Sequence, residues 1–221
     1  DATSAVFAQN VEWEKLDVIT FSWQKVLGGE AAHGILVLSP KAIEHLEKFT
    51  PSWPIPKIFR LTKSKKVIEG IFKGETLNTP SMLCVEDYLD ALKWVREIGG
   101  LEACIKRAND SFNFINAWVT NSSSIDFLCQ EESNRSNTSV CLKFRDDRVI
   151  NQDEDTQRNL AKEIGVLLED EDVALDVVNH RSAPPGLRIW TGATVEPTDV
   201  RDLLPWIDWA YNQAFNKIIE R

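Results

Sequence analysis

The sequence feature that most limits the possible folds is a pair of long helical patterns joined by two glycines. Residues 81–98 carry apolar side chains on one helical face, and residues 101–115 repeat this pattern. Gly99 and Gly100 predict the break between the two helices, because glycine enters the left-handed capping conformation at little cost. We therefore expect two consecutive helices that lead from one domain into another.

The part before these helices has the pattern of an α/β domain. Residues 16–21 and 34–38 are continuous apolar runs bounded by turn-forming residues, which is typical of strands buried on both faces. Pro40 begins a short helical pattern. Residues 50–79 are rich in Pro, Lys and Gly and lack periodicity, so we expect an irregular excursion there.

The part after the helices predicts a small α+β domain. Residues 139–144 alternate apolar and polar side chains, as a half-buried strand does. Two further strands are predicted at 173–178 and 187–190, and two amphipathic helices at 153–168 and 198–219. This order favours helices packed on one face of an antiparallel sheet.

Charge and hydropathy exclude two classes of partner. The 221 residues contain 25 Lys and Arg against 34 Asp and Glu, a net charge of −9, and they have no basic run, which argues against nucleic acid. No apolar stretch approaches the about 20 residues of a membrane span, and no signal peptide is apparent. We therefore expect a cytoplasmic protein without a membrane partner.

The four cysteines predict no metal site. Cys84, Cys104, Cys129 and Cys141 form no Cys-x-x-Cys pair, so we interpret them as buried free thiols. The single methionine is Met82 and the chain opens at Asp1, from which we expect a fragment that lacks an N-terminal part.

Lys25 is the first candidate for chemistry. It follows the first apolar run, between Gln24 and an apolar pair, and Gly28 and Gly29 come next. A lysine against a hydrophobic wall loses part of its ordinary pKa of about 10.4, and a neutral amine can form a Schiff base with an aldehyde. The alternative is a solvated lysine at a strand end. His33 is expected in the loop near Lys25, and His45 on a helix surface.

Two polar clusters could bind anions. His180, Arg181 and Arg188 flank a Pro-Pro-Gly turn, and guanidinium groups bind carboxylate or phosphate with two parallel hydrogen bonds. Asn78 and Thr79 precede a predicted helix start, where anions bind well. The alternatives are a salt-bridged hairpin for the first cluster and helix capping for the second.

In their order along the chain, these motifs resemble the phosphoserine aminotransferases, a family of the class V, fold-type-I pyridoxal-phosphate (PLP) aminotransferases. The resemblance rests on Asp-Ala-Thr-Ser-Ala (1–5), Trp-Gln-Lys-x-Leu-Gly-Gly (23–29), Asn-Thr-Pro (78–80), His-Arg (180–181) and Arg188. It covers essentially the whole chain.

The resemblance implies an α/β fold in two parts. Residues 1–105 would be the remainder of the PLP-binding large domain, with a mixed, mainly parallel sheet. Residues 106–221 would be the small C-terminal α+β domain. The chain would then be the C-terminal portion of the enzyme, and it is expected to be inactive alone, since the family's ring-stacking aromatic residue and much of its phosphate cradle lie before Asp1.

The resemblance also implies roles for the candidate residues. Lys25 would hold PLP as a Schiff base and move the reacting proton, Asp1 would pair with the pyridine nitrogen, and Gln24 would hydrogen-bond the cofactor. Asn78 and Thr79 would reach the PLP phosphate of the partner subunit in a homodimer.

The implied reaction transfers an amino group between L-glutamate and 3-phosphohydroxypyruvate, giving O-phospho-L-serine and 2-oxoglutarate. Arg188 would bind the α-carboxylate of the substrate, and His180 with Arg181 its phosphate.

Three alternatives remain open. A serine–pyruvate or alanine–glyoxylate type of class V aminotransferase would leave His180 and Arg181 without a phosphate to bind. A cysteine desulfurase would need a cysteine in a mobile catalytic loop, which we do not find. A catalytically silent fragment could act only as a dimerising or binding domain.

Overall fold

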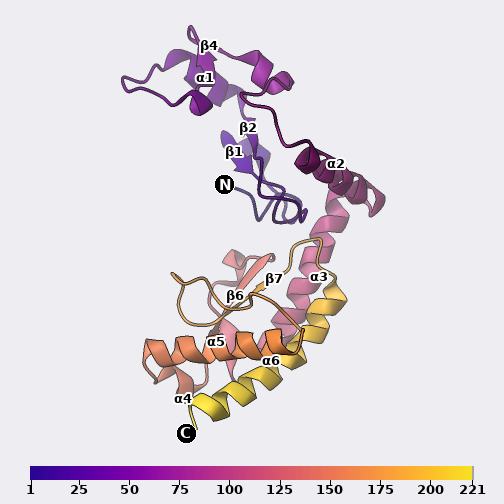
Figure 1. The fold of residues 1–221 in the computed structure, drawn as a ribbon, viewed down its shortest axis with the longest axis vertical. Coiled ribbons are helices and arrows are strands. Elements are labelled where there is room, and N and C mark those ends of the chain that lie inside the picture. The colour runs from indigo at the N-terminus through magenta and orange to yellow at the C-terminus, as the bar shows by residue number, and fades with distance from the viewer. Residues whose placement is uncertain (221) are drawn as a thin grey trace. The chain divides into compact units, whose positions relative to one another are not determined.

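The chain divides into two compact units. The computed structural model describes residues 1–220. The N-terminal unit comprises Asp1–Val6 and Asn10–Glu97, and the C-terminal unit comprises Phe7–Gln9 and the chain from Ile98 onward. In Figure 1 the first runs from indigo to magenta and the second from pink to yellow. The division falls between Glu97 and Ile98, at the end of the first predicted helix, whereas residue 105, our predicted domain boundary, lies within the second. As a domain boundary, residue 105 remains a proposal.

Two short strands form the first sheet of the N-terminal unit. β1 (Val18–Phe21) and β2 (Ile35–Leu38) pair antiparallel, with Phe21 opposite Ile35. The predicted strands are confirmed, but their expected burial on both faces is wrong. Ile19 and Phe21 are buried while Val18 is 59% exposed, so one face of the ribbon is buried and the other remains partly open.

The pairing direction also differs from the expectation. Every strand pairing among residues 1–220 is antiparallel, so the mainly parallel sheet implied by the resemblance does not occur in the described chain. A single sequence reports which residues are extended, and it does not report which neighbouring strand they pair with.

The rest of the N-terminal unit consists of short elements and one long helix. Ser39 caps α1, since its Oγ accepts a hydrogen bond from the Ala42 amide at 3.1 Å. The elements are α1 (Pro40–Lys48), β3 (Thr62–Lys63), β4 (Lys66–Val67), α2 (Met82–Glu97) and the 3₁₀ turns Trp13–Lys15, Lys57–Phe59 and Glu69–Lys73. As predicted, residues 50–79 contain no long helix or strand.

The two-glycine junction behaves as predicted. Gly99 and Gly100 both have positive φ angles, of 115° and 79°, in the conformation that residues with a side chain rarely adopt. α2 therefore ends before them, and α3 (Gly100–Asn121) begins at once.

The C-terminal unit contains a three-stranded antiparallel sheet in the order β5-β6-β7. Its strands are β5 (Ile125–Phe127), β6 (Ser139–Phe144) and β7 (Leu187–Trp190). β5 was not predicted, and the predicted strand at 173–178 is wrong, since only Val178 forms an isolated bridge there, to Leu187. Asp176 adopts a positive φ of 54°, which interrupts an extended chain.

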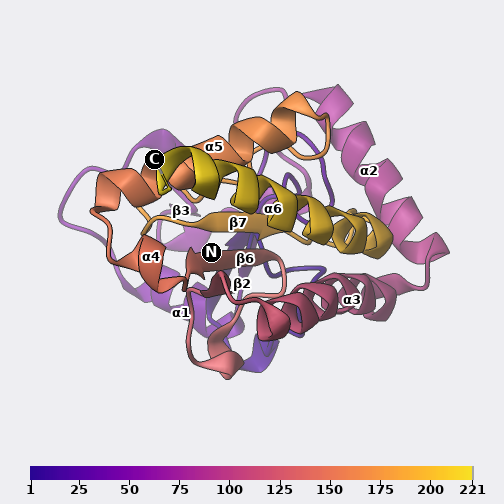
Figure 2. The same ribbon diagram turned by 90° about the horizontal axis from the view of Figure 1, so that it is seen from below.

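Helices cover one face of this sheet. Alternate residues of all three strands are buried against α3, α5 (Glu154–Asp170) and α6 (Pro197–Ile218), and α4 (Asp147–Ile150) is a single turn. Figure 2 shows α5 and α6 lying side by side along the sheet. The predicted arrangement of helices on one face of an antiparallel sheet is confirmed. No helix within residues 1–220 is both long and apolar enough to cross a membrane.

Candidate functional site

Lys25 lies in a tight loop that follows β1. The loop closes through hydrogen bonds from the Gly29 amide to the Trp23 carbonyl and from the Gly28 amide to the Lys25 carbonyl, both at 3.2 Å. Gly28 has a φ of 69°, which a glycine adopts without strain. Val26 and Leu27 are buried beneath the loop, and the Lys25 side chain is exposed. The expected hydrophobic wall around Lys25 is therefore absent from the described chain.

Asp1 is held at the same end of β1. The Ala2 amide donates to the Thr20 carbonyl at 2.8 Å, and the Thr3 hydroxyl oxygen accepts from the Ser22 amide at 3.2 Å. Asp1 Oδ1 in turn accepts hydrogen bonds from the Thr3 amide and hydroxyl, at 2.8 and 2.7 Å. The structure thus brings the Asp1 carboxylate to the strand end from which the loop with Gln24 and Lys25 begins.

An aromatic cluster that the sequence analysis missed supports this loop. The Trp23 ring stacks on Tyr88 of α2, with 4.4 Å between ring centroids and 9° between planes. The ring centroids of His33 and Trp23 are 5.7 Å apart, and His33 Nε2 accepts a hydrogen bond from the Ser81 backbone amide at 3.1 Å. The only signal in the sequence was a tryptophan directly before Gln24 and Lys25.

Asn78 and Thr79 are exposed just before α2. They belong to the N-terminal unit, as Asp1, Gln24 and Lys25 do. Ser81, two residues further on, is the residue whose amide His33 binds. The position before a helix start is the one that the sequence predicted.

His180 and Arg181 are exposed in a turn that Asn179 fixes. The side-chain Nδ2 of the buried Asn179 donates to the backbone carbonyls of Leu142 and Pro184, both at 3.2 Å. Gly186 is required at the end of this turn, because a Cβ there would lie 2.1 Å from the Leu142 carbonyl oxygen. His180 Nδ1 accepts from the Ser182 amide at 3.2 Å.

Unlike the exposed His180 and Arg181, Arg188 is half-buried and forms an ion pair. It lies on β7, and its guanidinium group forms an ion pair with Asp176 at 2.8 Å. The salt-bridged alternative is therefore what the structure shows for Arg188. The sequence analysis missed Asp176, because nothing in the sequence indicates that it folds back onto β7.

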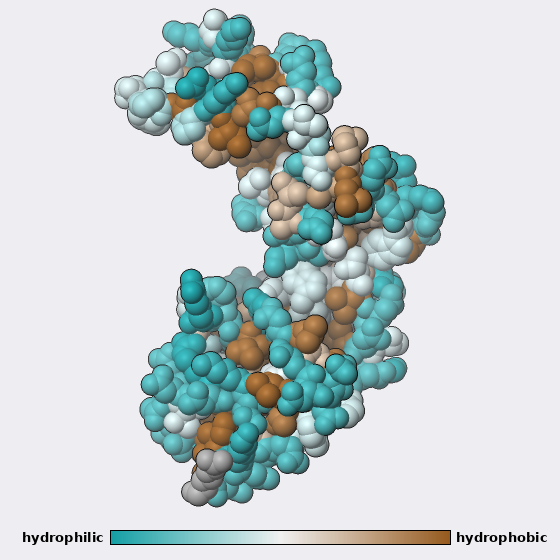
Figure 3. Space-filling view, viewed as in Figure 1, coloured by the Kyte–Doolittle hydropathy of each residue, from teal (hydrophilic) through white to brown (hydrophobic). Residues whose placement is uncertain are grey.

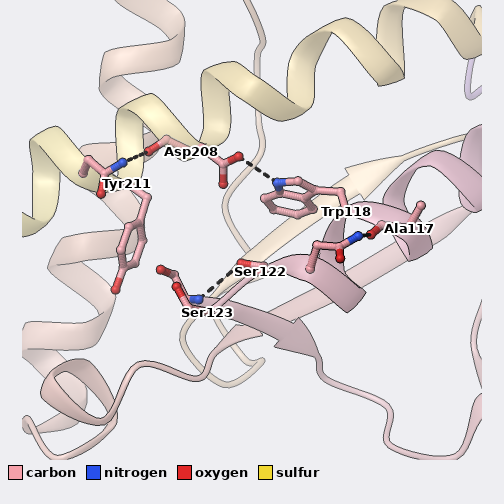
Figure 4. A pocket seen from close by; sticks show the side chains of 9 residues that line it. Ala117, Trp118, Ser122, Ser123, Asp208 and Tyr211 are labelled. Atoms are coloured by element: carbon pink, nitrogen blue, oxygen red, sulfur yellow. Dashed lines mark hydrogen bonds between the residues drawn. The ribbon is translucent and has the colours of Figure 1, made fainter.

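The C-terminal unit also contains a polar pocket of about 580 Å³ that none of the predicted site residues lines. Figure 4 shows Trp118 donating its indole N–H to Asp208, at 3.0 Å, above Ser122 and Ser123. Tyr211 lines the pocket, and burial raises its pKa to about 12.

The cysteines carry no disulfide within residues 1–220. Cys84 and Cys104 are buried free thiols, whereas Cys129 and Cys141 are half-buried, so the prediction of buried thiols is right for the first two. Burial raises the pKa of the Cys104 thiol. The described residues contain no group of three or more His, Cys, Asp or Glu side chains that could hold a metal ion.

Comparison with known proteins agrees with the resemblance found in the sequence. The chain is 52% identical over 212 residues to the phosphoserine aminotransferase of Methanosarcina barkeri, and the match covers 96% of this chain. Over nearly its whole length, the chain is therefore similar to phosphoserine aminotransferases. It spans 55% of the length of that relative. No family model matches the chain.

Solved structures of the family have the same fold. A phosphoserine aminotransferase from Cytophaga hutchinsonii matches 95% of this chain and 54% of its own, with a TM-score of 0.74 and 20% identity. A PLP-bound phosphoserine aminotransferase from Trichomonas vaginalis matches 94% of this chain and 52% of its own, with a TM-score of 0.73 and 18% identity. The predicted resemblance to fold-type-I enzymes is thereby confirmed at the level of the fold.

Proposed function

We propose that this chain is part of a PLP-dependent phosphoserine aminotransferase that transfers an amino group between L-glutamate and 3-phosphohydroxypyruvate. The observation that carries the proposal is the 52% identity to the Methanosarcina barkeri enzyme over nearly the whole chain. A serine–pyruvate or alanine–glyoxylate enzyme would share the fold, but it would not account for this identity.

The residues at the end of β1 fit the cofactor. An exposed amine at Lys25 can reach an aldehyde, and the Asp1 carboxylate is held by Thr3 at the same strand end. PLP, when bound, supplies a protonated aromatic ring that withdraws electrons from the substrate Cα. Asp1 would pair with the ring nitrogen and keep it protonated, and Gln24 would donate a hydrogen bond to the ring substituents.

Lys25 would have two tasks. Its amine would hold the cofactor covalently before substrate arrives, and the freed amine would then take the proton from the substrate Cα and return it to the cofactor side. The short loop restrains the lysine backbone through the Gly28 and Gly29 hydrogen bonds, so the amine stays within reach during both steps.

Asn78 and Thr79 would bind the phosphate of the cofactor held by the partner subunit. Both are exposed, and they stand before the start of α2, where backbone amides and the helix dipole favour an anion. A complete site would then need a homodimer.

Three cations would recognise the substrate. His180 and Arg181 are exposed in a turn held by Asn179, and they would bind the phosphate ester that distinguishes phosphoserine. Arg188 would bind the α-carboxylate that phosphoserine and glutamate share. Asp176 already places a carboxylate on this guanidinium group, and the remaining N–H groups can donate hydrogen bonds to a second carboxylate.

The test is an assay of the full-length enzyme with two amino donors. We expect transfer to 2-oxoglutarate from O-phospho-L-serine, with at least about tenfold higher kcat/KM than from L-alanine, since L-alanine offers no phosphate to His180 and Arg181. Lys25→Ala should abolish transfer, and borohydride reduction followed by peptide mapping should place the pyridoxyl label on Lys25.

Lys15→Ala is the matched control, because Lys15 is an exposed lysine of the same unit whose partner is the neighbouring Glu12. It should keep full activity. Faster transfer from L-alanine than from phosphoserine would refute the proposed substrate, and a label on another lysine would refute the role of Lys25.

A further inference from the structure

Trp23 is the residue on which the Lys25 loop is packed. It is 4% exposed, its carbonyl accepts the Gly29 amide, and its ring stacks on Tyr88 of α2. Gly29 lies so close to the indole that a Cβ there would be 2.5 Å from Trp23 Cδ1. The loop and the ring are therefore fitted to each other, and neither can shift without displacing the other.

Ring packing, and not hydrogen bonding, holds the indole in this place. The Trp23 Nε1 atom is buried and has no hydrogen-bond partner in the chain up to residue 220. A buried donor without a partner is destabilising, so the favourable contribution must come from the stacked faces. A phenylalanine at this position would retain the stacking face and remove the unpaired donor.

His33 extends the contact from Trp23 to the start of α2. Its ring is tilted by 55° against the indole, and its Nε2 accepts the Ser81 amide, one of the amides that a helix start leaves without a partner. Pro80 links Ser81 to Thr79, and its ring restricts the backbone between them. A path of contacts thus runs from the Lys25 loop through Trp23 and His33 to Ser81, which Pro80 joins along the chain to Asn78 and Thr79.

We propose that Trp23 and His33 are positioning residues that hold the Lys25 loop and the Asn78–Thr79 segment in a fixed position relative to each other. This inference rests on the proposed function, in which Lys25 serves the cofactor of its own subunit and Asn78 with Thr79 serve that of the partner. The Trp23–His33 link would then connect the two active sites of the dimer, because loosening it disturbs a contact at each site.

Hydrogen exchange with peptide-level mass spectrometry tests the link in the full-length enzyme. His33→Ala should raise the exchange rate of the Ser81 amide and also of the Gly28 and Gly29 amides, each by about threefold to tenfold, as expected for the loss of one hydrogen bond. His33→Gln should restore slow exchange at both places, because its carboxamide oxygen can accept the Ser81 amide. Trp23→Leu should act like His33→Ala, and Trp23→Phe should be close to wild type.

Two measurements on the cofactor complete the test. His33→Ala and Trp23→Leu should weaken PLP binding by about threefold to tenfold and shift the absorbance maximum of the bound cofactor, whereas His33→Gln should change neither. His45→Ala is the matched control, since His45 is an exposed histidine on α1 of the same unit, and it should change no readout.

The outcomes separate this inference from the proposed function. Faster exchange at Ser81 with unchanged exchange at Gly28 and Gly29 and unchanged cofactor affinity would overturn the link. A wild-type enzyme that binds no PLP would overturn the proposed function, while the exchange rates would still report whether Trp23 and His33 join the two segments.

Discussion

The two units of this chain bury their apolar side chains to very different extents. The C-terminal unit has a continuous core to which Ile115, Leu142 and Ile164 contribute with no exposed surface. The N-terminal unit buries a few residues around Trp23 and leaves large side chains such as Phe59 and Leu83 mostly exposed. Figure 3 shows hydrophobic side chains gathered on the surface of the N-terminal unit.

The extent of burial indicates which of the two units is stabilised mainly by its own side chains. Helices α3, α5 and α6 cover one face of the β5-β6-β7 sheet, so the C-terminal unit has a continuous core built from its own elements. Exposed apolar patches of the kind found on the N-terminal unit mark surfaces that pack against other protein. The proposed cofactor residues Asp1, Lys25, Asn78 and Thr79 all lie in that less self-sufficient unit.

A cavity in the C-terminal core should lower the free energy of unfolding more than any other change considered for this chain. Leu142→Ala removes a fully buried side chain and should lower the free energy of unfolding by about 2–5 kcal/mol. Leu175→Ala, at a leucine of the same unit that is 80% exposed, should change it by less than about 0.5 kcal/mol. Urea unfolding followed by tryptophan fluorescence measures both, and equal losses would contradict a core centred on β6.

The two tyrosines of the chain report on one unit each. Burial raises the pKa of Tyr211 in the C-terminal unit to about 12, and it also raises that of Tyr88 beside Trp23. Because a raised pKa favours the neutral phenol in the folded state, the stabilisation is present below the unfolded pKa of about 10. It is lost as the pH rises from about 10 to 12.

We expect this loss to be about 1–2 kcal/mol for Tyr211, allowing for partial access of water to the phenol. Tyr211→Phe should abolish this loss of stability. In Tyr88→Phe, the only tyrosine left is Tyr211, and its phenolate absorbance should appear in one step centred near pH 12. A Tyr211 that ionises near its ordinary pKa would show that the C-terminal core is looser than described.

The smallest expected effect on stability comes from the exposed face of β2. Leu36 lines an apolar groove of about 470 Å³ together with Val18 and Leu46. Leu36→Thr should change the free energy of unfolding by less than about 0.5 kcal/mol and should lower the fluorescence of the hydrophobic dye ANS. Ile150→Thr, at a similarly exposed residue of the C-terminal unit, is the control and should leave dye binding unchanged. Equal dye binding by both variants would show that the N-terminal unit does not expose more apolar surface to the dye than the C-terminal unit.

Local sequence patterns were sufficient to predict several of the helices and strands, although they missed β5 and wrongly predicted a strand at 173–178. The apolar periodicity of residues 81–98 and 101–115, with Gly99 and Gly100 between them, was sufficient to predict α2 and α3, because both signals act within a few residues. The alternation at 139–144 predicted β6 for the same reason. The order of short motifs along the chain was also sufficient to indicate the resemblance to phosphoserine aminotransferases, which the identity to the Methanosarcina barkeri enzyme confirms.

The contacts between elements could be known only from the folded chain. The antiparallel pairing of β1 with β2, the ion pair between Arg188 and Asp176 and the stacking of Trp23 on Tyr88 each join residues that are separated along the chain. Such contacts depend on how whole elements pack, and the periodicity of a single segment carries no information about its neighbours. The exposure of Lys25 has the same origin, since burial is a property of the surrounding elements and not of the loop that carries the lysine.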